Sequence, residues 1–359
     1  MRIISLTYIN SAEFDQPPDW IRRLYAFTGV WEEIGKQHEV FCIEQINYTG
    51  DYIHNGVQYY FRNYGKGVNR FPLRLHKLVK KIKPDIVLVR GLHFPLQLIQ
   101  LRMTVGNNVK IICEHHADRP SIGWKKSLNR IAFRRVNIFH FTSAGNAEEW
   151  IRSGNITDAS KCKEIQAGST YFSGYNKQKN RQELQWRDGL HFIWTGRLDA
   201  NKDPLTVLKA FAKFLLVEPS AHLHMIYLDD PLLPEIKKML EVDELLAKAV
   251  LLHGKIPHEQ LQRWYSAADF YISASHYESG GIALIEAMAC GCIPVVTAIP
   301  SSMTAVGENG FYFKPGDADD LYEKLVETKS VLIDDFSKKV KDRFRRELSF
   351  EVIARRFFE

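Results

Sequence analysis

The stretch Ser275–Gly291 reads SHYESGGIALIEAMACG. It follows the apolar run Asp269–Ala274, whose length and composition predict a buried strand. Gly280 and Gly281 open a loop after this strand, and the residues from Ile282 onward are apolar over the length of a short helix. The stretch therefore predicts a strand, a glycine-containing loop and a buried helix, which is the repeating unit of a parallel α/β sheet.

Glu286 is the single charge in this helical run. Its neighbours three and four positions away on a helix are Ile282, Ala283, Ala289 and Cys290, all apolar or small. We therefore expect no Lys or Arg partner on its helix face, and a buried carboxylate is costly unless something binds it. Because a helix start preceded by glycines lets a phosphate approach free N–H groups, the pattern predicts an anion at the helix start and a hydroxyl donor at the carboxylate.

The run E-S-G-G-I-A-L-I-E-A-M-A-C-G-C-I-P-V-V, residues 278–296, resembles the signature of retaining nucleotide-sugar glycosyltransferases of family 4. That family has the GT-B fold, in which two Rossmann-like β/α/β domains face each other across a cleft. The resemblance implies that Glu278 contacts the hydroxyls of the donor sugar and that Glu286 binds the ribose hydroxyls. It also implies that the backbone between them cradles the diphosphate, through Gly280, Gly281, Ile282 and Ala283. The ordinary alternative is a helix with one satisfied glutamate, and the combined pattern favours the donor site.

A second motif, T-G-R-L-D-A-N-K-D-P, covers Thr195–Pro204. Asp203 fits a helix N-cap and Pro204 fits the first helical position, so Arg197 and Lys202 lie in a strand-to-helix loop. Two cations at the carboxyl edge of a sheet suit a diphosphate. The family has a similar run, and the resemblance implies that both cations bind the donor diphosphate and stabilise the departing nucleotide. Solvated surface charges are the alternative.

Two weaker candidates lie elsewhere. E-H-H-A-D follows the apolar run Val109–Cys113, and the family often has a histidine at this strand end near the transferred sugar. His115 matches that position best and is our catalytic candidate, with His116 as the alternative; a structural histidine is the competing interpretation. Gly254 and Lys255 resemble a family loop near the nucleotide base.

Length and composition limit the remaining choices. The chain has 359 residues, 41.5 kDa and 45% hydrophobic residues, which suits two domains with real cores. No apolar run approaches the about 18 residues of a transmembrane helix, and MRIISLTYI at the start is not a signal peptide. The five cysteines form no C-x-x-C pair, so we expect a cytoplasmic protein without disulfides or zinc.

Strands and helices alternate along the chain, which predicts a parallel sheet in each half. The polar run Ser169–Asp188 is the predicted linker. The expected domains are 1–170, an N-terminal acceptor domain; 171–336, a C-terminal nucleotide-sugar donor domain; and 337–359, a helical segment that crosses back. Tyr48–Tyr64 receives no assignment. The predicted strands are Arg2–Ile9, Glu39–Ile46, Asp85–Arg90, Val109–Glu114, Asn137–Phe141, Lys161–Gly168, Leu190–Thr195, His222–Leu228, Ala249–His253, Phe270–Ala274 and Ile293–Thr297. The predicted helices are Trp20–Lys36, Phe71–Lys83, Phe94–Val105, Lys125–Arg135, Asn146–Ser153, Pro204–Leu216, Leu232–Leu240, His258–Ala267, Ile282–Cys290 and Ala318–Thr328.

Two features depart from the family. Its first strand usually runs into a Gly-Gly loop, whereas Thr7–Asp19 contains no glycine. Its strand at His222–Leu228 usually ends in Gly-x-Gly, whereas here Asp229, Asp230 and Pro231 follow. Acceptor contacts and base selectivity therefore do not transfer from the resemblance.

The charge is uneven along the chain. Residues 1–170 carry a balance of +9 and residues 171–359 a balance of −3. In the segment Phe71–Lys83, Leu75, Leu78, Val79 and Ile82 form an apolar stripe, and the cations lie on the opposite side. The alternatives are a solvated helix face and a surface that docks peripherally on the inner face of an anionic membrane. No nucleic-acid recognition motif is present. The cations of the segment are Arg74, Lys77, Lys80 and Lys81.

The resemblance implies a retaining transfer of a sugar from a UDP- or GDP-sugar to a glycan, lipid-linked or small acceptor. No carboxylate is placed as a nucleophile, so a same-face mechanism is implied. No D-x-D lies in a metal-binding context, so we expect neither a divalent ion nor another cofactor to be required. The alternatives are a catalytically silent GT-B subunit and a phosphorylase-like or epimerase-like GT-B enzyme.

Overall fold

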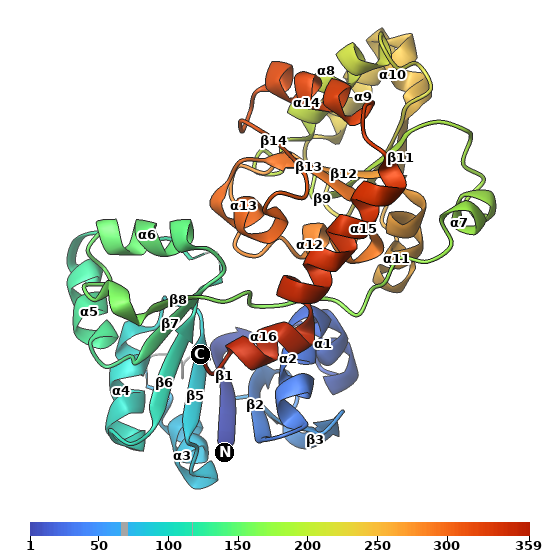
Figure 1. Ribbon diagram of the computed structural model, residues 1–359. Helices are drawn as coiled ribbons and strands as arrows, with labels where there is room; N and C mark the ends of the chain where they lie inside the picture. The colour runs from blue at the N-terminus through green and yellow to red at the C-terminus, as the bar shows by residue number, and fades with distance from the viewer. Residues whose placement is uncertain (66–70, 117) are drawn as a thin grey trace. The chain divides into compact units, whose positions relative to one another are not determined.

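Two α/β units make up the chain in the computed structural model, which describes residues 1–65, 71–116 and 118–359. The first unit comprises Met1–Ser169 and Phe350–Glu359, and the second comprises Thr170–Ser349. Each unit contains one sheet covered by helices (Figure 1). The predicted pair of parallel α/β domains is confirmed, and the chain passes from one unit to the other next to the predicted boundary at residue 170.

The sheet of the first unit has eight strands in the order β3-β4-β2-β1-β5-β6-β7-β8. All neighbouring pairs are parallel except β3 and β4. The order reverses beside β1, because β2 lies on one side of it and β5 on the other. The strands are β1 (Arg2–Ser11), β2 (Glu39–Ile46), β3 (Gly50–His54), β4 (Val57–Arg62), β5 (Ile86–Arg90), β6 (Lys110–Glu114), β7 (Ile138–Phe141) and β8 (Cys162–Glu164). The helices are α1 (Pro17–Arg23), α2 (Tyr25–Gly35), α3 (Leu73–Ile82), α4 (Pro95–Val105), α5 (Gly123–Phe133), α6 (Ala144–Arg152), the single turn η2 (Ala159–Lys161) and α16 (Phe350–Arg356).

The unassigned segment Tyr48–Tyr64 forms an antiparallel hairpin of β3 and β4. Asn55 and Gly56 make the turn with φ of 46° and 81°. An Asn-Gly pair tolerates these left-handed angles, which is why it is a strong hairpin signal. This signal was present in the sequence and identifies the hairpin.

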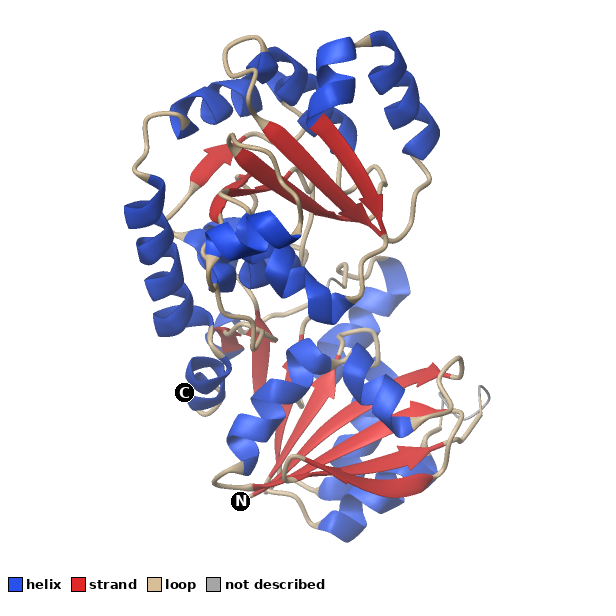
Figure 2. Ribbon diagram, turned by 90° about the vertical axis from the view of Figure 1, so that its right-hand side faces the viewer, coloured by secondary structure: helices blue, strands red, loops and turns tan. Residues whose placement is uncertain are grey.

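Helices cover both faces of the first sheet (Figure 2). On one face, α3, α4 and α5 bury residues such as Leu75, Leu98 and Phe133. On the other face, α1, α2 and α16 pack through residues such as Trp31 and Phe350. The predicted stripe of α3 is confirmed: Leu75, Val79 and Ile82 are buried, Leu78 is half-buried, and all four cations are exposed.

The C-terminal segment returns to the first unit later than predicted. Helix α15 (Ile333–Arg343) and the π-helical turn η3 (Phe344–Leu348) belong to the second unit. Arg343 holds α15 there by donating to the carbonyls of Thr304 (2.7 Å) and Ala305 (3.0 Å). Of the helices in this C-terminal segment, only α16 belongs to the first unit. There Phe350 packs so closely on Gly29 that a Cβ at Gly29 would lie 2.6 Å from the Phe350 ring. The proposed segment 337–359 therefore divides at residue 350.

The sheet of the second unit has six parallel strands in the order β11-β10-β9-β12-β13-β14. The order reverses at β9, which lies between β10 and β12. The strands are β9 (His191–Gly196), β10 (His222–Tyr227), β11 (Val250–Gly254), β12 (Phe270–Ser273), β13 (Ile293–Thr297) and β14 (Phe311–Phe313). The remaining helices are α7 (Lys177–Glu183), α8 (Pro204–Leu215), α9 (Leu233–Val242), α10 (Glu244–Ala249), α11 (His258–Ala267), α12 (Ile282–Cys290), α13 (Pro300–Val306) and α14 (Ala318–Thr328).

The predicted linker contains an ordered helix. Lys177 and Arg181 of α7 pair with the buried carboxylate of Asp269 at 3.0 and 2.6 Å. Two cations offset the burial of Asp269, and its pKa is lowered despite the opposing effect of burial. The polar composition of this stretch thus reflects a helix attached to the second unit by charge.

Candidate functional site

The two charged motifs follow the two strands at the point where the strand order of the second sheet reverses. Thr195–Pro204 leads from β9 into α8, and Ser275–Gly291 contains the loop after β12 and the whole of α12. Strands β9 and β12 are paired in parallel, so their carboxyl ends lie at one edge. In open α/β sheets, ligands bind at this edge beside such a reversal.

The loop between β9 and α8 is folded by its own polar residues. The Asp203 carboxylate caps α8 by accepting from the Thr206 N–H (3.2 Å), and Pro204 occupies the first turn, as predicted. Asp199 accepts from the Lys202 N–H (2.9 Å) and pairs with the Arg197 guanidinium (3.1 Å). The loop therefore presents both cations at the strand end, with Arg197 more than half exposed.

The loop after β12 is bonded to this first loop at several points. The His276 N–H donates to the Asn201 carbonyl (2.8 Å), and the Asn201 amide donates to the Tyr277 carbonyl (3.1 Å). The Lys202 ammonium forms an ion pair with the Glu278 carboxylate, which also accepts from the Ser275 hydroxyl (3.0 Å). The structure thus brings two predicted site residues from separate motifs into direct contact.

Helix α12 begins at this place and is otherwise buried. Gly281 precedes it with φ of 59°, a left-handed angle that glycine adopts without strain. Gly280, Gly281, Ile282 and Ala283 are half-buried, whereas every later residue of α12 is buried. The N-terminus of α12 thus lies beside the loop that carries Lys202. Free N–H groups next to a cation suit the binding of an anion.

Glu286 is buried in α12, and its partner comes from another helix. His258 Nε2 at the start of α11 lies 2.7 Å from Glu286 Oε1. As expected, its own helix supplies no Lys or Arg, and the hydrogen-bond partner is a histidine from α11. Burial raises the pKa of Glu286 to about 8 and lowers the pKa of His258. The sequence carries no signal for this pair, because 28 positions separate the two residues.

Gly254 and Lys255 lie at the carboxyl end of β11, the edge strand separated from β9 by β10. Gly254 has φ of 64°, which permits the turn. Three histidines that include His253, the residue before Gly254, form a chain of hydrogen bonds. The chain ends where His191 Nε2 donates to the Arg187 carbonyl (2.8 Å). His224 Nε2 therefore donates to His191 Nδ1 (3.1 Å), and His253 Nε2 donates to His224 Nδ1 (3.0 Å). Burial lowers the pKa of all three imidazoles.

The first unit has a cavity of about 270 Å³ at the corresponding edge of its own sheet. It lies beside the reversal between β1 and β5, so residues that follow both strands line it. Arg90 forms a buried ion pair with Glu44, which also accepts from Trp20 Nε1 (3.1 Å). The lining residues are Thr7, Ile9, Ser11, Trp20, Leu24, Phe27, Arg90, Gly91, His93, Phe94, His116 and Asp118.

The two candidate histidines have different surroundings. His115 is fully buried: its Nε2 donates to the Asp118 carbonyl (2.9 Å), and its ring packs against Phe141. His116 lines the cavity, and its Nε2 lies 2.6 Å from the Glu114 carboxylate. His116, and not His115, therefore lines this cavity. The burial of His115 favours His116, and which of the two is the active-site histidine stays a prediction.

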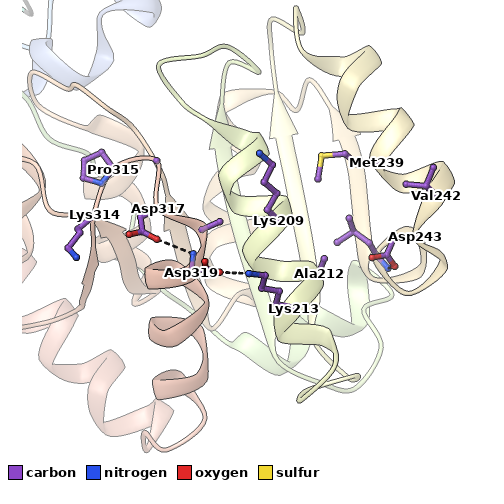
Figure 3. Close-up of a pocket in the computed structure, with 13 residues that line it drawn as sticks. Lys209, Ala212, Lys213, Met239, Val242, Asp243, Lys314, Pro315, Asp317 and Asp319 are labelled. Atoms are coloured by element: carbon purple, nitrogen blue, oxygen red, sulfur yellow. Dashed lines mark hydrogen bonds and ion pairs between the residues drawn. The ribbon is translucent and has the colours of Figure 1, made fainter.

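A separate cavity of about 860 Å³ lies among α8, α9, α10 and the loop before α14 (Figure 3). Lys209 and Lys213 of α8 line it, and Lys213 pairs with Asp319. It contains none of the predicted site residues.

Two further structural findings concern the whole described chain. Among its described residues, no helix combines the length and apolar character needed to cross a membrane. In the same residues, no three His, Cys, Asp or Glu side chains come together in a way that could hold a metal ion.

Comparison with solved structures gives the class of fold. The HepE protein of Anabaena, solved in complex with UDP, matches with a TM-score of 0.72 and 14% identity, over 100% of this chain and 98% of that chain. With the two parallel sheets, this likeness identifies the GT-B fold.

Sequence comparison finds a family model that matches the second unit. Residues 176–340 match the family described as glycosyl transferases group 1. The D-inositol 3-phosphate glycosyltransferase of Thermomonospora curvata is 30% identical over 133 residues, which are 34% of this chain and 31% of that protein. The chain thus matches about a third of the length of this relative. The GDP-mannose:cellobiosyl-diphosphopolyprenol alpha-mannosyltransferase of Xanthomonas oryzae pv. oryzae is 22% identical over 252 residues, 68% of this chain and 64% of that protein.

Proposed function

We propose that the protein transfers a sugar from a nucleoside diphosphate sugar to an acceptor, with retention of the anomeric configuration and without a metal ion. The observation that carries this proposal is the Lys202–Glu278 contact at the carboxyl edge between β9 and β12. In this contact a cation lies next to a carboxylate, which supports neighbouring sites for a diphosphate and a sugar. The group 1 match over residues 176–340 supports it, because that range contains both motifs.

In this proposal each charged group meets one part of the donor. Arg197, Lys202 and the amide end of α12 bind the diphosphate, and Glu286 accepts from the ribose hydroxyls. Glu278 accepts from the hydroxyls of the transferred sugar. Gly254 and Lys255 border the nucleotide base. Positive charge and N–H groups aimed at the leaving diphosphate stabilise the charge that develops as the glycosidic bond breaks.

The Lys202–Glu278 ion pair holds both side chains in position before the donor binds. Each side chain is about one-fifth exposed, so the pair is partly desolvated and holds both groups at the site. A diphosphate would compete with Glu278 for the ammonium, which releases the carboxylate to meet the sugar. Lys202 thus exchanges one ion pair for another, and hydroxyl groups of the sugar donate to the released carboxylate.

The acceptor domain in this proposal is the first unit, and its cavity beside β1 and β5 takes the acceptor hydroxyl. His116 lines this cavity and is the group proposed to contact the acceptor, whereas the resemblance put His115 near the transferred sugar. The protein from Xanthomonas takes a diphosphopolyprenol-linked acceptor according to its name, and the Thermomonospora relative takes an inositol phosphate. A sugar or lipid-linked acceptor is therefore the proposed class.

A silent GT-B subunit is the alternative function. Such a subunit would not need its donor groups, yet Arg197, Lys202, Glu278 and Glu286 all occupy the second unit in the geometry described. An epimerase-like or phosphorylase-like enzyme would share the nucleotide or sugar contacts, so the products must distinguish these reactions.

The deciding experiment has two steps. Thermal shifts with UDP, GDP, ADP and CMP identify the nucleotide, and the matching sugar donors are then incubated with the protein. We expect one nucleoside diphosphate to stabilise the protein and its sugar donor to be consumed with release of that nucleotide. A silent subunit would release no nucleotide from any sugar donor, and an epimerase would convert the sugar without transferring it to an acceptor.

A further inference from the structure

Exposed apolar side chains gather at the starts of three neighbouring helices in the first unit. Because β4, β5, β6 and β7 run parallel, the connecting helices α3, α4 and α5 all begin at the carboxyl edge of the sheet. This is the edge that holds the cavity with His116. Five residues at these helix starts form what we call the apolar rim: Phe71, Leu73, Leu96, Ile122 and Trp124.

Four of the five members of the apolar rim are more than half exposed, and Leu96 is 38% exposed. Ile122 is 85% exposed, Trp124 73%, Phe71 64% and Leu73 60%. Single exposed apolar residues need no explanation, but a group at one edge marks an interaction surface. Tryptophan suits the boundary between water and an apolar phase, because its ring is apolar and its N–H is polar.

The chain around the apolar rim is strongly basic. Residues 119–135 contain six Lys or Arg and no Asp or Glu, and residues 71–83 contain five and again no acidic residue. Arg119 pairs with Glu149, whereas Lys125 is exposed and its ammonium lies 5.9 Å from the centre of the Trp124 ring. Basic helices with exposed apolar and aromatic residues bind anionic membrane surfaces.

The charge argues against a second copy of the chain as the occupant. A symmetric dimer through this face would bring the same cations of both copies together. An anionic lipid surface instead supplies the complementary charge and accepts the apolar side chains.

The acceptor cavity opens next to this surface. A second cavity of about 530 Å³ is lined by Leu96, Ile122 and Trp124 of the apolar rim, and His93 lines both cavities. We propose that the apolar rim inserts into the interface of an anionic membrane and that the acceptor reaches the His116 cavity from the bilayer, past His93. This inference rests on the proposed glycosyl transfer and assigns a membrane-borne acceptor to it.

Vesicle co-sedimentation tests the apolar rim. The vesicles are phosphatidylcholine alone or mixed with phosphatidylglycerol, each at low and high salt. We expect wild type to bind the mixed vesicles and to bind them less at high salt. The Ile122→Ser/Trp124→Ser variant should lose about tenfold or more in partition coefficient, because two large side chains no longer leave water. The matched control is Val242→Ser/Leu332→Ser, two exposed apolar residues of the second unit, and it should bind as wild type does.

A charge variant tests the second part of the surface. Lys125→Glu/Lys126→Glu should lose at least about tenfold, since each cation near an anionic leaflet contributes roughly fivefold. The control is Lys237→Glu/Lys238→Glu on α9, which changes the same charge in the second unit. The folded state of each variant is checked by its nucleotide-dependent thermal shift, which these changes should leave intact.

Three results would overturn the inference. One is equal sedimentation of wild type on neutral and mixed vesicles, and another is wild-type binding by both variants of the first unit. The third is a wild-type dimer that Ile122→Ser/Trp124→Ser converts to a monomer, which would make the rim a protein interface. Transfer to a soluble acceptor without vesicle binding would refute only this inference, whereas vesicle binding without any nucleotide effect would refute only the proposed reaction.

Discussion

The second unit places charged side chains at the carboxyl edge of its sheet, and they pair with one another across two loops. The first unit has its cavity at the equivalent edge of its own sheet, where aromatic and apolar residues surround the buried Arg90–Glu44 pair. Both sites lie beside a reversal of strand order, so the fold supplies the position in both cases. The two differ in their side chains: the second unit presents charges that suit the proposed diphosphate, whereas polar and apolar residues together line the cavity of the first unit.

The match to the family model also separates the two units. It covers residues 176–340, within the second unit, and stops before α16. The residues proposed to bind the donor come mainly from two continuous motifs, whereas the lining of the cavity in the first unit comes from segments spread between Thr7 and Asp118. Short motifs therefore predict the proposed donor site, and the proposed acceptor site emerges only in the folded structure.

The largest expected effect tests the cations of the second unit. Arg197→Ala and Lys202→Ala should each lose about 2–4 kcal/mol of transition-state stabilisation, measured as kcat/KM, because each removes positive charge from the leaving diphosphate. The double variant should lose much less than the sum, since both groups act on one diphosphate. Lys209→Ala, an exposed lysine further along α8, is the matched control and should keep wild-type kcat/KM. Full activity in either single variant would contradict the assigned role.

The next effect separates the two glutamates. Glu286→Ala should weaken the binding of free nucleotide by up to about tenfold, since a hydrogen bond between neutral groups contributes roughly 0.5–1.5 kcal/mol. Glu278→Ala should lower kcat more than nucleotide affinity, because its proposed contact is the sugar. Calorimetry with the free nucleotide and steady-state kinetics measure the two quantities. Equal losses of nucleotide affinity in both variants would remove the distinction.

A smaller effect separates the two histidines of the first unit. His116→Ala should lower kcat roughly tenfold, because it removes a hydrogen-bonding contact proposed for the acceptor, and should leave nucleotide affinity unchanged. His115→Ala should instead lower the free energy of unfolding by about 1–3 kcal/mol, because it opens a space against Phe141 and leaves the Asp118 carbonyl without this donor. The reverse assignment, with a stable but inactive His115→Ala protein, would restore the first histidine as the site residue.

The sequence predicted the candidate site of the second unit more directly than that of the first for a physical reason. Apolar runs predict strands, and residues such as Asp203 and Pro204 predict helix starts. These predictions succeed because strands and helix starts depend on residues that are close in sequence. The motifs around Lys202 and Glu278 are local too, and their contact follows from the pairing of β9 with β12. The His258–Glu286 pair is different, because it depends on the packing of α11 against α12.

Local composition also misled where a distant partner decides the outcome. The polar stretch 169–188 has the composition of a linker, but Asp269 holds α7 in place through two of its cations. Likewise, His115 and His116 are adjacent at one strand end, and only the packing around Phe141 and Trp150 buries the first of them.

The smallest predicted effect concerns the pH dependence of stability in the second unit. Burial raises the pKa of Glu286 to about 8, so between about pH 4.5 and 8 the folded protein holds a proton that the unfolded chain releases. The stability that this group contributes is therefore fully present below its unfolded pKa and is lost as pH rises through the folded pKa. Glu286→Gln removes the titration and keeps a polar group beside His258, so the unfolding free energy of wild type relative to this variant should fall by about 1 kcal/mol or more from pH 5 to about pH 8. His258 titrates in both proteins, so most of its own contribution, which has the opposite sign, cancels in the difference. Denaturant unfolding without nucleotide at several pH values measures this difference, and a difference independent of pH would show that Glu286 is ionised in the folded protein and that His258 holds it as a charged pair.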